Sequence, residues 1–394
     1  MEKEILNALK IAIKEASGKA FLVGGCVRDE LLNRSFNDLD IEVFNIEEKY
    51  LSSLLEKIGP VDKVGKSFGI YTFKHTNIDI ALPRKEIKKG HRHQDFKIIS
   101  DPYLDYKEAA SRRDITINAF MKDLETGEIL DFFGGLDDLK NHKIRHINER
   151  FIEDPLRIFR ACRFAAQLNF DIVQETIEIS RSIDVSTLSK ERINSETDKA
   201  LLAVKPALYF INLAKMNKVN TFFSSLIVDD VLLNNLTLAS ALKNELINPL
   251  KIMYLVLILN VEDGYKFLSQ FSNKNCFNHD IVTMKLLYLQ LDTCFDKIGI
   301  FDSFKRIGNY QDVVKLYQLL NKERAEIVDD ILFEYQKYDA KEKIKAQDLL
   351  AIGFGAGKEL GTLLKQANKL LIDLEKSEVL KLMEDLWRKQ KTAS

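Results

Sequence analysis

The chain of 394 residues is longer than one ordinary hydrophobic core requires, which predicts two to four domains. Its 58 basic and 59 acidic residues give a formal net charge of −1, so nucleic-acid binding would have to use local basic patches. The four cysteines form no C-x-x-C pair, which argues against a disulfide framework and against a zinc site. The charged, amphipathic N-terminus is unlike a signal peptide, and no apolar run approaches the roughly 20 residues of a membrane span. We therefore expect a reduced, cytoplasmic protein without a membrane partner.

Residues 1–145 alternate short strand-like runs with short helical runs, a pattern typical of α/β units. The polar and basic stretch 84–110 predicts a long mobile loop with a turn at Asp101-Pro102. Strands are predicted at Ala20–Val23, Leu39–Phe44, Ile70–Phe73, Ile78–Ala81 and Ala119–Asp123.

The character of the chain changes after Asp154. Glycines become sparse, and Pro155, Pro206 and Pro249 are the only prolines that remain. Leu, Ile, Lys and Glu recur at helical spacing almost to the C-terminus, which predicts an elongated all-helical body. The expected fold class is therefore α+β and multidomain, with its strands in the N-terminal part.

Two aspartates stand one residue apart at the start of a predicted strand. The strand period of two places Asp38, Asp40 and Glu42 on one face. Neighbouring carboxylates repel one another unless a cation lies between them, and Mg²⁺ shared with substrate phosphates is the natural partner. A solvated strand edge bearing acids is the alternative. Asp79, in the strand at Ile78–Ala81, is a candidate third carboxylate, and Glu42 competes for that role.

A Gly24-Gly25 turn precedes these acids, between a strand and a helical run. Glycines there let backbone N–H groups approach a phosphate, and Arg28 adds a bidentate donor. A plain strand-to-helix turn is the alternative.

A second polar cluster spans Ser111–Ala119. Its two arginines, Arg112 and Arg113, stand beside an aspartate, and such an ion pair can aim one guanidinium at a triphosphate. Asn118 could hydrogen-bond a ribose or cap a turn. A surface salt bridge is the alternative for the whole cluster.

A third cluster begins at Asp154-Pro155, the pattern of a helix N-cap with proline at the first helical position. Capping does not explain why Arg157, Arg160 and Arg163 recur every three residues. An aspartate beside an arginine one turn away offers an acceptor and a donor that match the edge of cytosine or adenine. Uracil and guanine present a carbonyl there, and such a mispaired polar contact gives large discrimination.

In this order, the clusters resemble the class II tRNA nucleotidyltransferases of the polymerase β superfamily. That family includes CCA-adding enzymes, their CC-adding and A-adding relatives, and bacterial poly(A) polymerases. The matching strings are LVGGCVRDELL with NDLDIEVF, RRDITINAF, DFFGGLDDLKNHKIRH and EDPLRIFRACRFAAQLNF, within residues 20–170.

The resemblance implies a polymerase-β-like nucleotidyltransferase head with a mixed β-sheet at 1–145, then an elongated all-α remainder. The remainder would comprise a neck with a nucleotide-template helix at 146–205, a body at 206–290 and a tRNA-binding tail at 291–394. It also implies catalytic residues at Asp38, Asp40 and the third carboxylate. Asp38 and Asp40 would bind two Mg²⁺ ions, for which Mn²⁺ can substitute. The implied nucleotide-binding residues are Gly25, Arg28, Arg113, Asp154, Arg157, Arg160 and Arg163.

The activity implied is addition of C, C and A to the tRNA 3′ end from CTP and ATP, with release of pyrophosphate. The stretch 84–110 lies where family members carry the flexible element needed for the switch to A, which favours full CCA addition. The segment Gly353–Gly361 resembles the family's late helix–turn–helix, which could offer backbone amides and Lys358 to tRNA phosphates, although the usual proline is missing.

Several alternatives remain open. An A-adding or CC-adding enzyme would share the same motifs, and so would a bacterial poly(A) polymerase, which usually carries a strongly basic C-terminal extension. A non-catalytic RNA-binding module would not need both Asp38 and Asp40. No protein partner is deducible.

Overall fold

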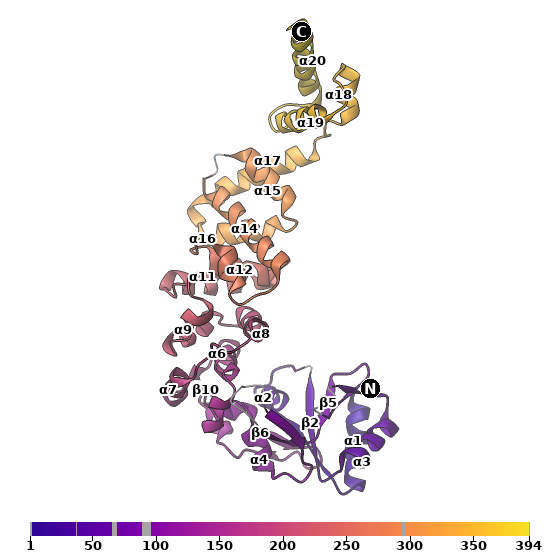
Figure 1. The fold of residues 1–394 in the computed structure, drawn as a ribbon, viewed down its shortest axis with the longest axis vertical. Coiled ribbons are helices and arrows are strands. Elements are labelled where there is room, and N and C mark those ends of the chain that lie inside the picture. Colours follow the sequence, from indigo (N-terminus) through magenta and orange to yellow (C-terminus); the bar gives the residue numbers. More distant parts are fainter. Residues whose placement is uncertain (1, 37, 65–68, 89–95, 294–295, 394) are drawn as a thin grey trace. The chain divides into compact units, whose positions relative to one another are not determined.

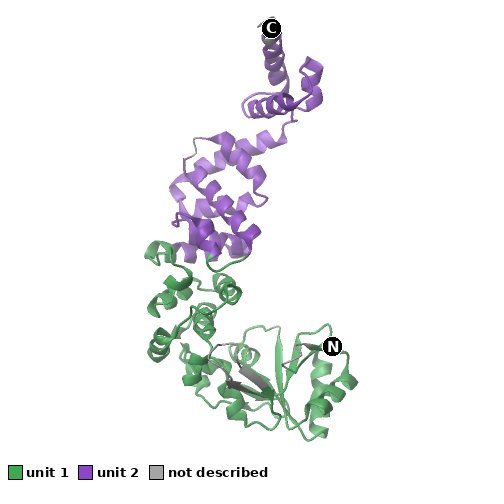
Figure 2. Ribbon diagram, in the orientation of Figure 1, with its two compact units in different colours: residues 1–233, 270–273 green, residues 234–269, 274–394 purple. Residues whose placement is uncertain are grey.

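The computed structural model describes residues 2–393 apart from 37, 65–68, 89–95 and 294–295. The chain forms two compact units (Figure 2). Unit 1 comprises Met1–Leu233 and Gln270–Asn273, and unit 2 comprises Asn234–Ser269 and Lys274–Ser394. The predicted division into head, neck, body and tail stays a prediction, as does the elongation. Within the described part of the chain, no helix combines the length and apolar character that a membrane crossing requires.

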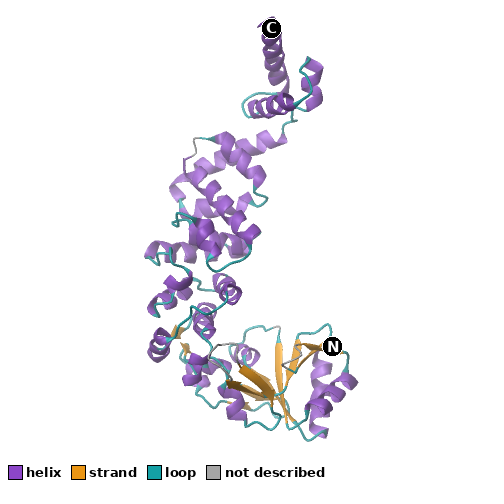
Figure 3. Ribbon diagram, in the orientation of Figure 1, coloured by secondary structure: helices purple, strands orange, loops and turns teal. Residues whose placement is uncertain are grey.

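A mixed sheet organises the first part of unit 1, as predicted (Figures 1 and 3). Its described strands are β1 (Lys19–Val23), β2 (Leu39–Phe44), β3 (Val61–Val64), β4 (Ile70–Phe73), β5 (Ile78–Ala81), β8 (Met121–Asp123) and β9 (Ile129–Leu130). They pair in the order β3-β4-β5-β2-β1-β8-β9. β2 and β5 run parallel, and the other neighbouring pairs run antiparallel. Three of the predicted strands have the predicted bounds, whereas β1 begins one residue early and β8 two residues late.

Helix α4 (Tyr106–Ser111) covers part of one face of this sheet. Phe44 of β2 packs edge-on against Tyr106, with ring centroids 4.8 Å apart, within a buried apolar cluster. Because side chains alternate along a strand, Asp40 and Glu42 point to the same face as Phe44. Helix α4 therefore lies beside the acidic positions.

Helices α1 (Glu2–Glu15) and α3 (Glu48–Ile58) pack against each other beside the sheet (Figure 1). Leu9 and Ile13 are the buried residues of α1, which confirms the amphipathic N-terminal helix.

The prediction of a long loop over 84–110 is wrong for much of that stretch. β6 (Arg84–Lys88) and β7 (Phe96–Ser100) pair as an antiparallel hairpin, and α4 follows them. The polar composition concealed these strands because a two-stranded ribbon outside the main sheet does not require apolar alternation. The middle of the predicted loop, 89–95, lies outside the described residues.

The segment between β7 and α4 turns as predicted at Asp101-Pro102. The Tyr103 N–H donates to Asp101 Oδ1 over 3.1 Å, and the Glu108 N–H donates to the Asp105 carboxylate, which caps α4.

The described residues beyond Asp154 are helical except for connections and one short strand, as predicted (Figure 3). That strand, β11 (Asp171–Ile172), pairs in parallel with β10 (Lys143–Ile144). The remaining helices of unit 1 are α2 (Gly25–Leu31), η1 (Thr116–Asn118), α5 (Gly135–Lys140), η2 (Glu149–Glu153), α6 (Leu156–Leu168), α7 (Gln174–Ser182), α8 (Lys190–Leu201), α9 (Ala207–Lys215) and α10 (Val219–Phe222). Helix α11 (Asp230–Ala241) begins in unit 1 and continues into unit 2. Unit 2 further contains η3 (Lys243–Glu245), α12 (Pro249–Ile258), α13 (Gly264–Ser269), α14 (Asn275–Thr293), α15 (Lys297–Arg306), α16 (Tyr310–Leu320), η4 (Lys322–Arg324), α17 (Ala325–Ala340), α18 (Ala346–Ile352), α19 (Lys358–Leu370) and α20 (Lys376–Ala393).

Candidate active site

The predicted site residues come from separate segments of the chain, yet they line one cavity of about 800 Å³ in unit 1. Apart from Asp79, every residue predicted for metal or nucleotide binding is in its wall: Gly25, Arg28, Asp38, Asp40, Arg113, Asp154, Arg157, Arg160 and Arg163. The other described lining residues are Gly24, Arg84, Arg112, Asp114, Asn118, Leu156, Phe164, Arg192 and Lys199.

Negative charge gathers where β2 begins. Asp40 is paired in parallel register with Asp79 of β5, so the two side chains point to the same face. Asp79 Oδ1 accepts a hydrogen bond from the Thr72 hydroxyl over 2.6 Å. Partial loss of hydration raises the pKa of Asp40, and the Arg113 guanidinium opposes that rise. The carboxylates of Asp79 and Asp38 raise the Asp40 pKa further, which indicates excess negative charge at this point.

Glu42 lies on the predicted face with Asp40 but is buried, unlike the exposed Asp38 and Asp40, so the alternative of a solvated strand edge does not hold for Glu42. Its side chain is only 3% exposed, its carboxylate pairs with the Arg112 guanidinium, and Arg113 Nη2 lies 3.7 Å from it. The cause is α4, which was predicted as loop: it covers this face, and the two arginines follow its last residue. Because the carboxylate of Glu42 is engaged by arginines, the geometry favours Asp79 as the third carboxylate, and that role stays a prediction.

The Gly24-Gly25 turn brings two arginines to the cavity. Gly24 has φ 77°, and a Cβ on it would lie 2.7 Å from Arg113 Nη1. Arg28 is buried, and its Nε and Nη2 donate to the Asp29 carboxylate over 2.9 and 2.8 Å. Its Nη1 donates to Asn118 Oδ1 over 2.5 Å, so the guanidinium is held in one orientation.

Asp114 is a buried junction between η1 and α6. Its Oδ1 accepts from the Ile115 backbone N–H at 2.9 Å and from Asn118 Nδ2 at 3.0 Å, and its Oδ2 accepts from Arg160 Nε at 2.7 Å. Burial alone would raise the pKa of Asp114, but the Arg160 charge and these hydrogen bonds together hold that pKa below its ordinary value. An ionised Asp114 therefore fixes Arg160 at the cavity.

Helix α6 begins at Leu156, one residue later than the Asp-Pro pattern predicts, with Pro155 at its N-cap position. Pro155 already has helical backbone angles, and Asp154 Oδ1 accepts from the Leu156 N–H over 3.1 Å. Asp154 Oδ2 accepts from Arg192 Nη2 over 2.8 Å. Capping therefore occupies one carboxylate oxygen, and an arginine from another helix reaches the second.

Arg157 lies in the cavity wall, but its guanidinium has contacts that the sequence did not predict. Its Nη1 donates to the Arg150 carbonyl over 2.8 Å, and its Nη2 donates to the Arg112 carbonyl over 2.7 Å. This side chain thus ties α6 to η2 and to the end of α4, in addition to its place at the cavity.

Three arginines surround the ring of Phe164. The guanidinium carbons of Arg163, Arg28 and Arg160 lie 3.9, 5.0 and 5.5 Å from the ring centroid. Their like charges would repel one another, but each guanidinium also pairs with a carboxylate. The partners, in the same order, are Glu196, Asp29 and Asp114.

No pattern in the sequence singled out helix α8 as part of the site. Arg192, Glu196 and Lys199 stand at i, i+4 and i+7, which places them on one face. Arg192 and Lys199 line the cavity, and the buried Glu196 pairs with Arg163 behind it. The helical spacing of these charges was the available signal, but such a segment is also typical of a solvated helix.

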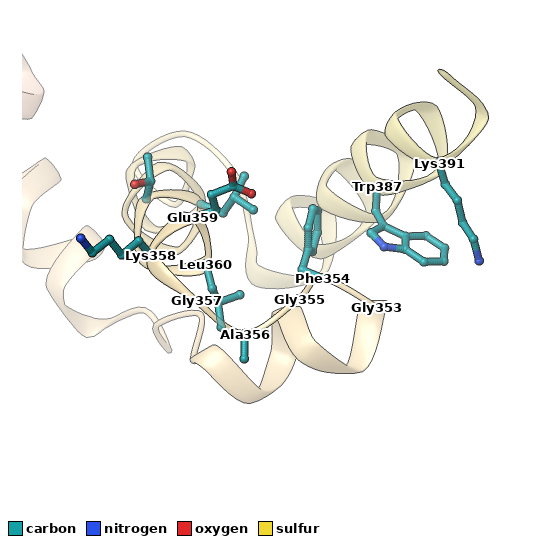
Figure 4. Close-up of a pocket in the computed structure, with 12 residues that line it drawn as sticks. Gly353, Phe354, Gly355, Ala356, Gly357, Lys358, Glu359, Leu360, Trp387 and Lys391 are labelled. Carbon is teal, nitrogen blue, oxygen red and sulfur yellow. The ribbon is translucent and has the colours of Figure 1, made fainter. Parts of the chain in front are cut away.

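Unit 2 contains a separate cavity of about 980 Å³ at the glycine-rich turn between α18 and α19 (Figure 4). Trp387 and Lys391 of α20 line it, with Lys391 Nζ 4.8 Å from the indole centroid. Gly353 has φ 115°, and a Cβ on it would lie 2.6 Å from Trp387 Cζ2. Lys358, at the start of α19, also lines the cavity, and its predicted contact with RNA stays a prediction.

Residues 20–145 match the family described as "Poly A polymerase head domain". A nucleotidyltransferase fold implies dependence on a divalent metal ion. Among the described residues, no group of three or more His, Cys, Asp or Glu side chains is arranged to hold a metal. Two carboxylates with substrate phosphates completing the coordination shell are nevertheless a usual arrangement for Mg²⁺. Burial is the main cause of the raised pKa of Asp40, and the nearby Asp79 and Asp38 carboxylates add to it. A cation would relieve the repulsion between these carboxylates, so Asp38 and Asp40 fit such an ion.

The chain is similar to curated proteins and to solved structures over different spans. It is 40% identical over 215 residues to the "Multifunctional CCA protein" of Pasteurella multocida, a match that covers 53% of this chain and 50% of that relative. It is 31% identical over 381 residues to the "CCA-adding enzyme" of Buchnera aphidicola, covering 94% of this chain and 80% of that relative. The fold resembles that of the Bacillus stearothermophilus CCA-adding enzyme in complex with CTP, with a TM-score of 0.76, 20% identity, and 100% and 99% of the two chains covered. The chain thus spans about half the length of the first relative and most of the second. It belongs to the family of CCA-adding enzymes.

Proposed function

We propose that this protein adds C, C and A to the 3′ end of tRNA, using CTP and ATP and releasing pyrophosphate. The observation that carries the proposal is the cavity of about 800 Å³, in which the paired aspartates, the Gly-Gly turn and the arginines of α6 come together. The names of the relatives support the same activity. Because the Pasteurella match covers only half of that relative, the activity, the substrates and the tRNA partner are proposals for this chain, as is the cytoplasmic location.

The reaction would take place at the start of β2, where a 3′-hydroxyl attacks the α-phosphate of the bound nucleotide. Asp38 and Asp40 would hold two Mg²⁺ ions, or Mn²⁺ as a substitute, and bound ions supply charge stabilisation to the attacking and leaving oxygens. Asp79 lies opposite Asp40 in register and is the proposed third carboxylate. It would either accept the proton of the attacking hydroxyl or complete the acidic site.

The arginines would neutralise the triphosphate. Arg28 is fixed by Asp29 and Asn118, and Arg113 is placed against Gly24. Donors fixed before the nucleotide binds need little reorganisation during the reaction, which is the condition for strong electrostatic stabilisation.

Base selection would use Asp154 as a hydrogen-bond acceptor. Cytosine and adenine offer an exocyclic amino group to a carboxylate, whereas uracil and guanine present a carbonyl that the carboxylate repels. Arg157, Arg160 and Arg163 would complete the base and phosphate pocket. The β6–β7 hairpin begins at Arg84 in the cavity wall, and we propose it as the element needed for the switch to A.

The test incubates the protein with tRNA transcripts that lack CCA, lack only A, or end elsewhere, and supplies each nucleoside triphosphate separately. Full CCA addition supports the proposal. Addition of only A, only CC, or unlimited A would assign the chain to one of the other branches. A different pair of results would refute the proposal: no nucleotide is incorporated, and no Mn²⁺ binds at Asp38 and Asp40 after soaking with CTP. These results would support the alternative of a non-catalytic RNA-binding module.

The role of Asp154 has its own test. We expect Asp154→Ala to relax the preference for C and A over U and G by about 10-fold or more, with little change in metal affinity, since Asp154 is not one of the proposed metal ligands. Asp171→Ala is a matched control, because Asp171 pairs with Lys143 at the surface and is outside the cavity wall. Unchanged base preference in Asp154→Ala would refute the assignment.

A further inference from the structure

Asp154 is held from outside its own helix by Arg192 of α8. Arg192 Nη2 donates to Asp154 Oδ2 over 2.8 Å, and the Leu156 N–H donates to Oδ1 over 3.1 Å. A carboxylate oxygen has two lone pairs, so each oxygen retains acceptor capacity for a ligand. Turning the carboxylate would weaken at least one of these two hydrogen bonds. Together they set the direction in which the remaining lone pairs of Asp154 point.

Helix α8 is anchored so that Arg192 arrives at a defined place. Glu196, one helical turn further, is 4% exposed, and its carboxylate accepts from Arg163 Nε. Arg160 Nη1 lies 4.0 Å from the same carboxylate. Since both arginines belong to α6, the buried pairing fixes α8 to the helix that begins beside Asp154.

The orienting contact of Asp154 therefore comes from α8. Arg157 is the arginine one turn along α6, but its two terminal nitrogens donate to the carbonyls of Arg150 and Arg112. Arg192 is 44% exposed at its side chain, and Asp154 is 34% exposed. An ion pair so exposed contributes little to folding, so removing it should test its effect on the site with the fold intact.

We infer that Arg192 is a positioning residue for base selection, which aims the Asp154 carboxylate at the exocyclic amino group of cytosine and adenine. The inference rests on the proposed function, in which Asp154 reads the base. Without Arg192 the carboxylate rotates more freely, so it accepts a poorer hydrogen bond from the correct base and turns away from the carbonyl of the wrong one. Both changes reduce discrimination, and they act through Asp154.

The first experiment compares Arg192→Ala and Arg192→Lys with wild type. kcat/KM is measured for CTP and UTP on tRNA lacking CCA, and for ATP and GTP on tRNA ending in CC. We expect Arg192→Ala to lower the CTP/UTP and ATP/GTP preferences on the order of 10-fold. Arg192→Lys should retain part of the preference, because it keeps a donor but loses the planar guanidinium. Unchanged preferences in Arg192→Ala would overturn the inference.

Lys199→Ala is the matched charge control, because Lys199 lies on the same face of α8 and lines the same cavity. Its loss should lower kcat/KM for right and wrong nucleotides alike and leave the preferences in place. An equal loss of preference in Lys199→Ala would attribute the effect of Arg192 to general cavity charge and would overturn its positioning role.

The double variant Asp154→Ala with Arg192→Ala tests whether Arg192 acts by positioning Asp154 or by its own contact with the base. If Arg192 acts through Asp154, the double variant has the same base preference as Asp154→Ala alone. Preferences that fall by the product of the two single effects would overturn the inference.

Equilibrium binding of CTP and UTP without RNA distinguishes failure of this inference from failure of the proposed function. If wild type transfers no nucleotide, the proposed function fails, and the binding comparison still tests Arg192. A CTP preference that Arg192→Ala loses supports the inference. A preference equal in both proteins, or no preference in wild type, overturns it.

Discussion

The cavity of unit 1 and the cavity of unit 2 differ in what holds their polar groups in place. In unit 1, arginines of the wall are fixed by carboxylates such as Asp114 and Glu196. In unit 2, the wall is formed by the glycine-rich turn, the start of α19 and the Trp387 ring, and its charged residues are the exposed Lys358, Glu359 and Lys391. The unit 2 cavity is the larger, at about 980 Å³ against about 800 Å³.

The larger cavity is thus the one with fewer fixed charges, so the volume of a cavity does not indicate whether a reaction takes place in it. Burying a charge costs free energy, and a partner offsets that cost only when the geometry is good. A protein that gathers several such pairs around a cavity has fixed its donors and acceptors before a ligand arrives, which suits a reaction that moves charge. The unit 2 cavity is instead shaped by backbone conformation and ring packing. Changes in unit 1 should therefore affect chemistry and ion-pair stability, whereas changes in unit 2 should affect local packing.

The largest effect is expected at Asp40. Asp40→Ala removes a carboxylate that would stabilise charge in the transition state, so we expect kcat for nucleotide addition to fall at least about 10²-fold. Stability should change little, because Asp40 reaches solvent. The measurement is single-turnover incorporation from CTP, with unfolding followed in parallel. Asp62→Ala, a surface acid of the same sheet that pairs with Lys74, should retain wild-type kcat. Wild-type turnover in Asp40→Ala would contradict the assignment of the site.

Asp114 tests whether the paired charges of unit 1 also support its fold. Asp114→Ala removes the carboxylate that Arg160 Nε contacts at 2.7 Å and leaves only the Glu196 carboxylate, 4.0 Å from Arg160 Nη1, so we expect the free energy of unfolding to fall by about 2–3 kcal/mol. The value is at the low end for a buried pair because the Arg160 side chain is 36% exposed. Asp171→Ala, which removes an exposed pair with Lys143, should cost less than about 1 kcal/mol. Urea unfolding followed by circular dichroism compares the two, and equal costs would refute the distinction between buried and exposed pairs.

The same carboxyl predicts a pH dependence. The pKa of Asp114 is lowered in the folded protein, so the unfolded chain takes up this proton first as the pH falls. Its stabilising contribution is thus complete above the ordinary aspartate value of about 3.9 and is lost as the pH falls through the lower folded value. Below about pH 4, wild type should lose stability more steeply with falling pH than Asp114→Asn. Parallel slopes for the two proteins in this range would contradict the prediction.

Much of the site could be predicted because its residues are contiguous in short strings. Three features depend only on residues that are adjacent in the chain, so the sequence could predict them: the Gly-Gly turn, the Asp38–Asp40 pair and the Asp-Pro start of α6. The burial of Glu42 could not be predicted in the same way, since it depends on α4, whose sequence Tyr106–Ser111 was concealed in a polar stretch.

The contacts of Arg192 and Glu196 are a second feature that the sequence could not predict. These residues lie about 40 positions after Asp154, and nothing in their helical spacing specifies which other helix they face. The strands β6 and β7 are a third such feature, because a polar two-stranded ribbon lacks the alternation that predicts a strand. Long-range pairing decides these features, whereas local patterns were enough to predict five strands of the main sheet and the helical character after Asp154; β3 and β9 were not predicted.

A smaller effect is expected from Gly353 in unit 2. Gly353→Ala places a Cβ at φ 115° and 2.6 Å from the Trp387 ring, so we expect a loss of about 2 kcal/mol from backbone strain and displaced packing. Trp387 is the only tryptophan of the chain, so its fluorescence reports unfolding at this cavity. The dissociation constant of CTP should stay the same, since the unit 1 cavity is unchanged. Weaker CTP binding in Gly353→Ala would contradict the independence of the two cavities.

The smallest expected effect is a gain in stability, from Gly361→Ala in the helix that follows the turn. Gly353→Ala serves as its control. Gly361 lies inside α19, and a Cβ there would meet no atom within 4 Å. Because alanine restricts the unfolded chain more than glycine and fits a helix without strain, Gly361→Ala should raise stability by about 0.5–1 kcal/mol. The same fluorescence measurement should therefore show the midpoint rising for Gly361→Ala and falling for Gly353→Ala. A rise in both variants would mean that the turn at Gly353 is not held by its backbone conformation and its contact with Trp387, whereas a fall in both would refute the gain expected for Gly361→Ala.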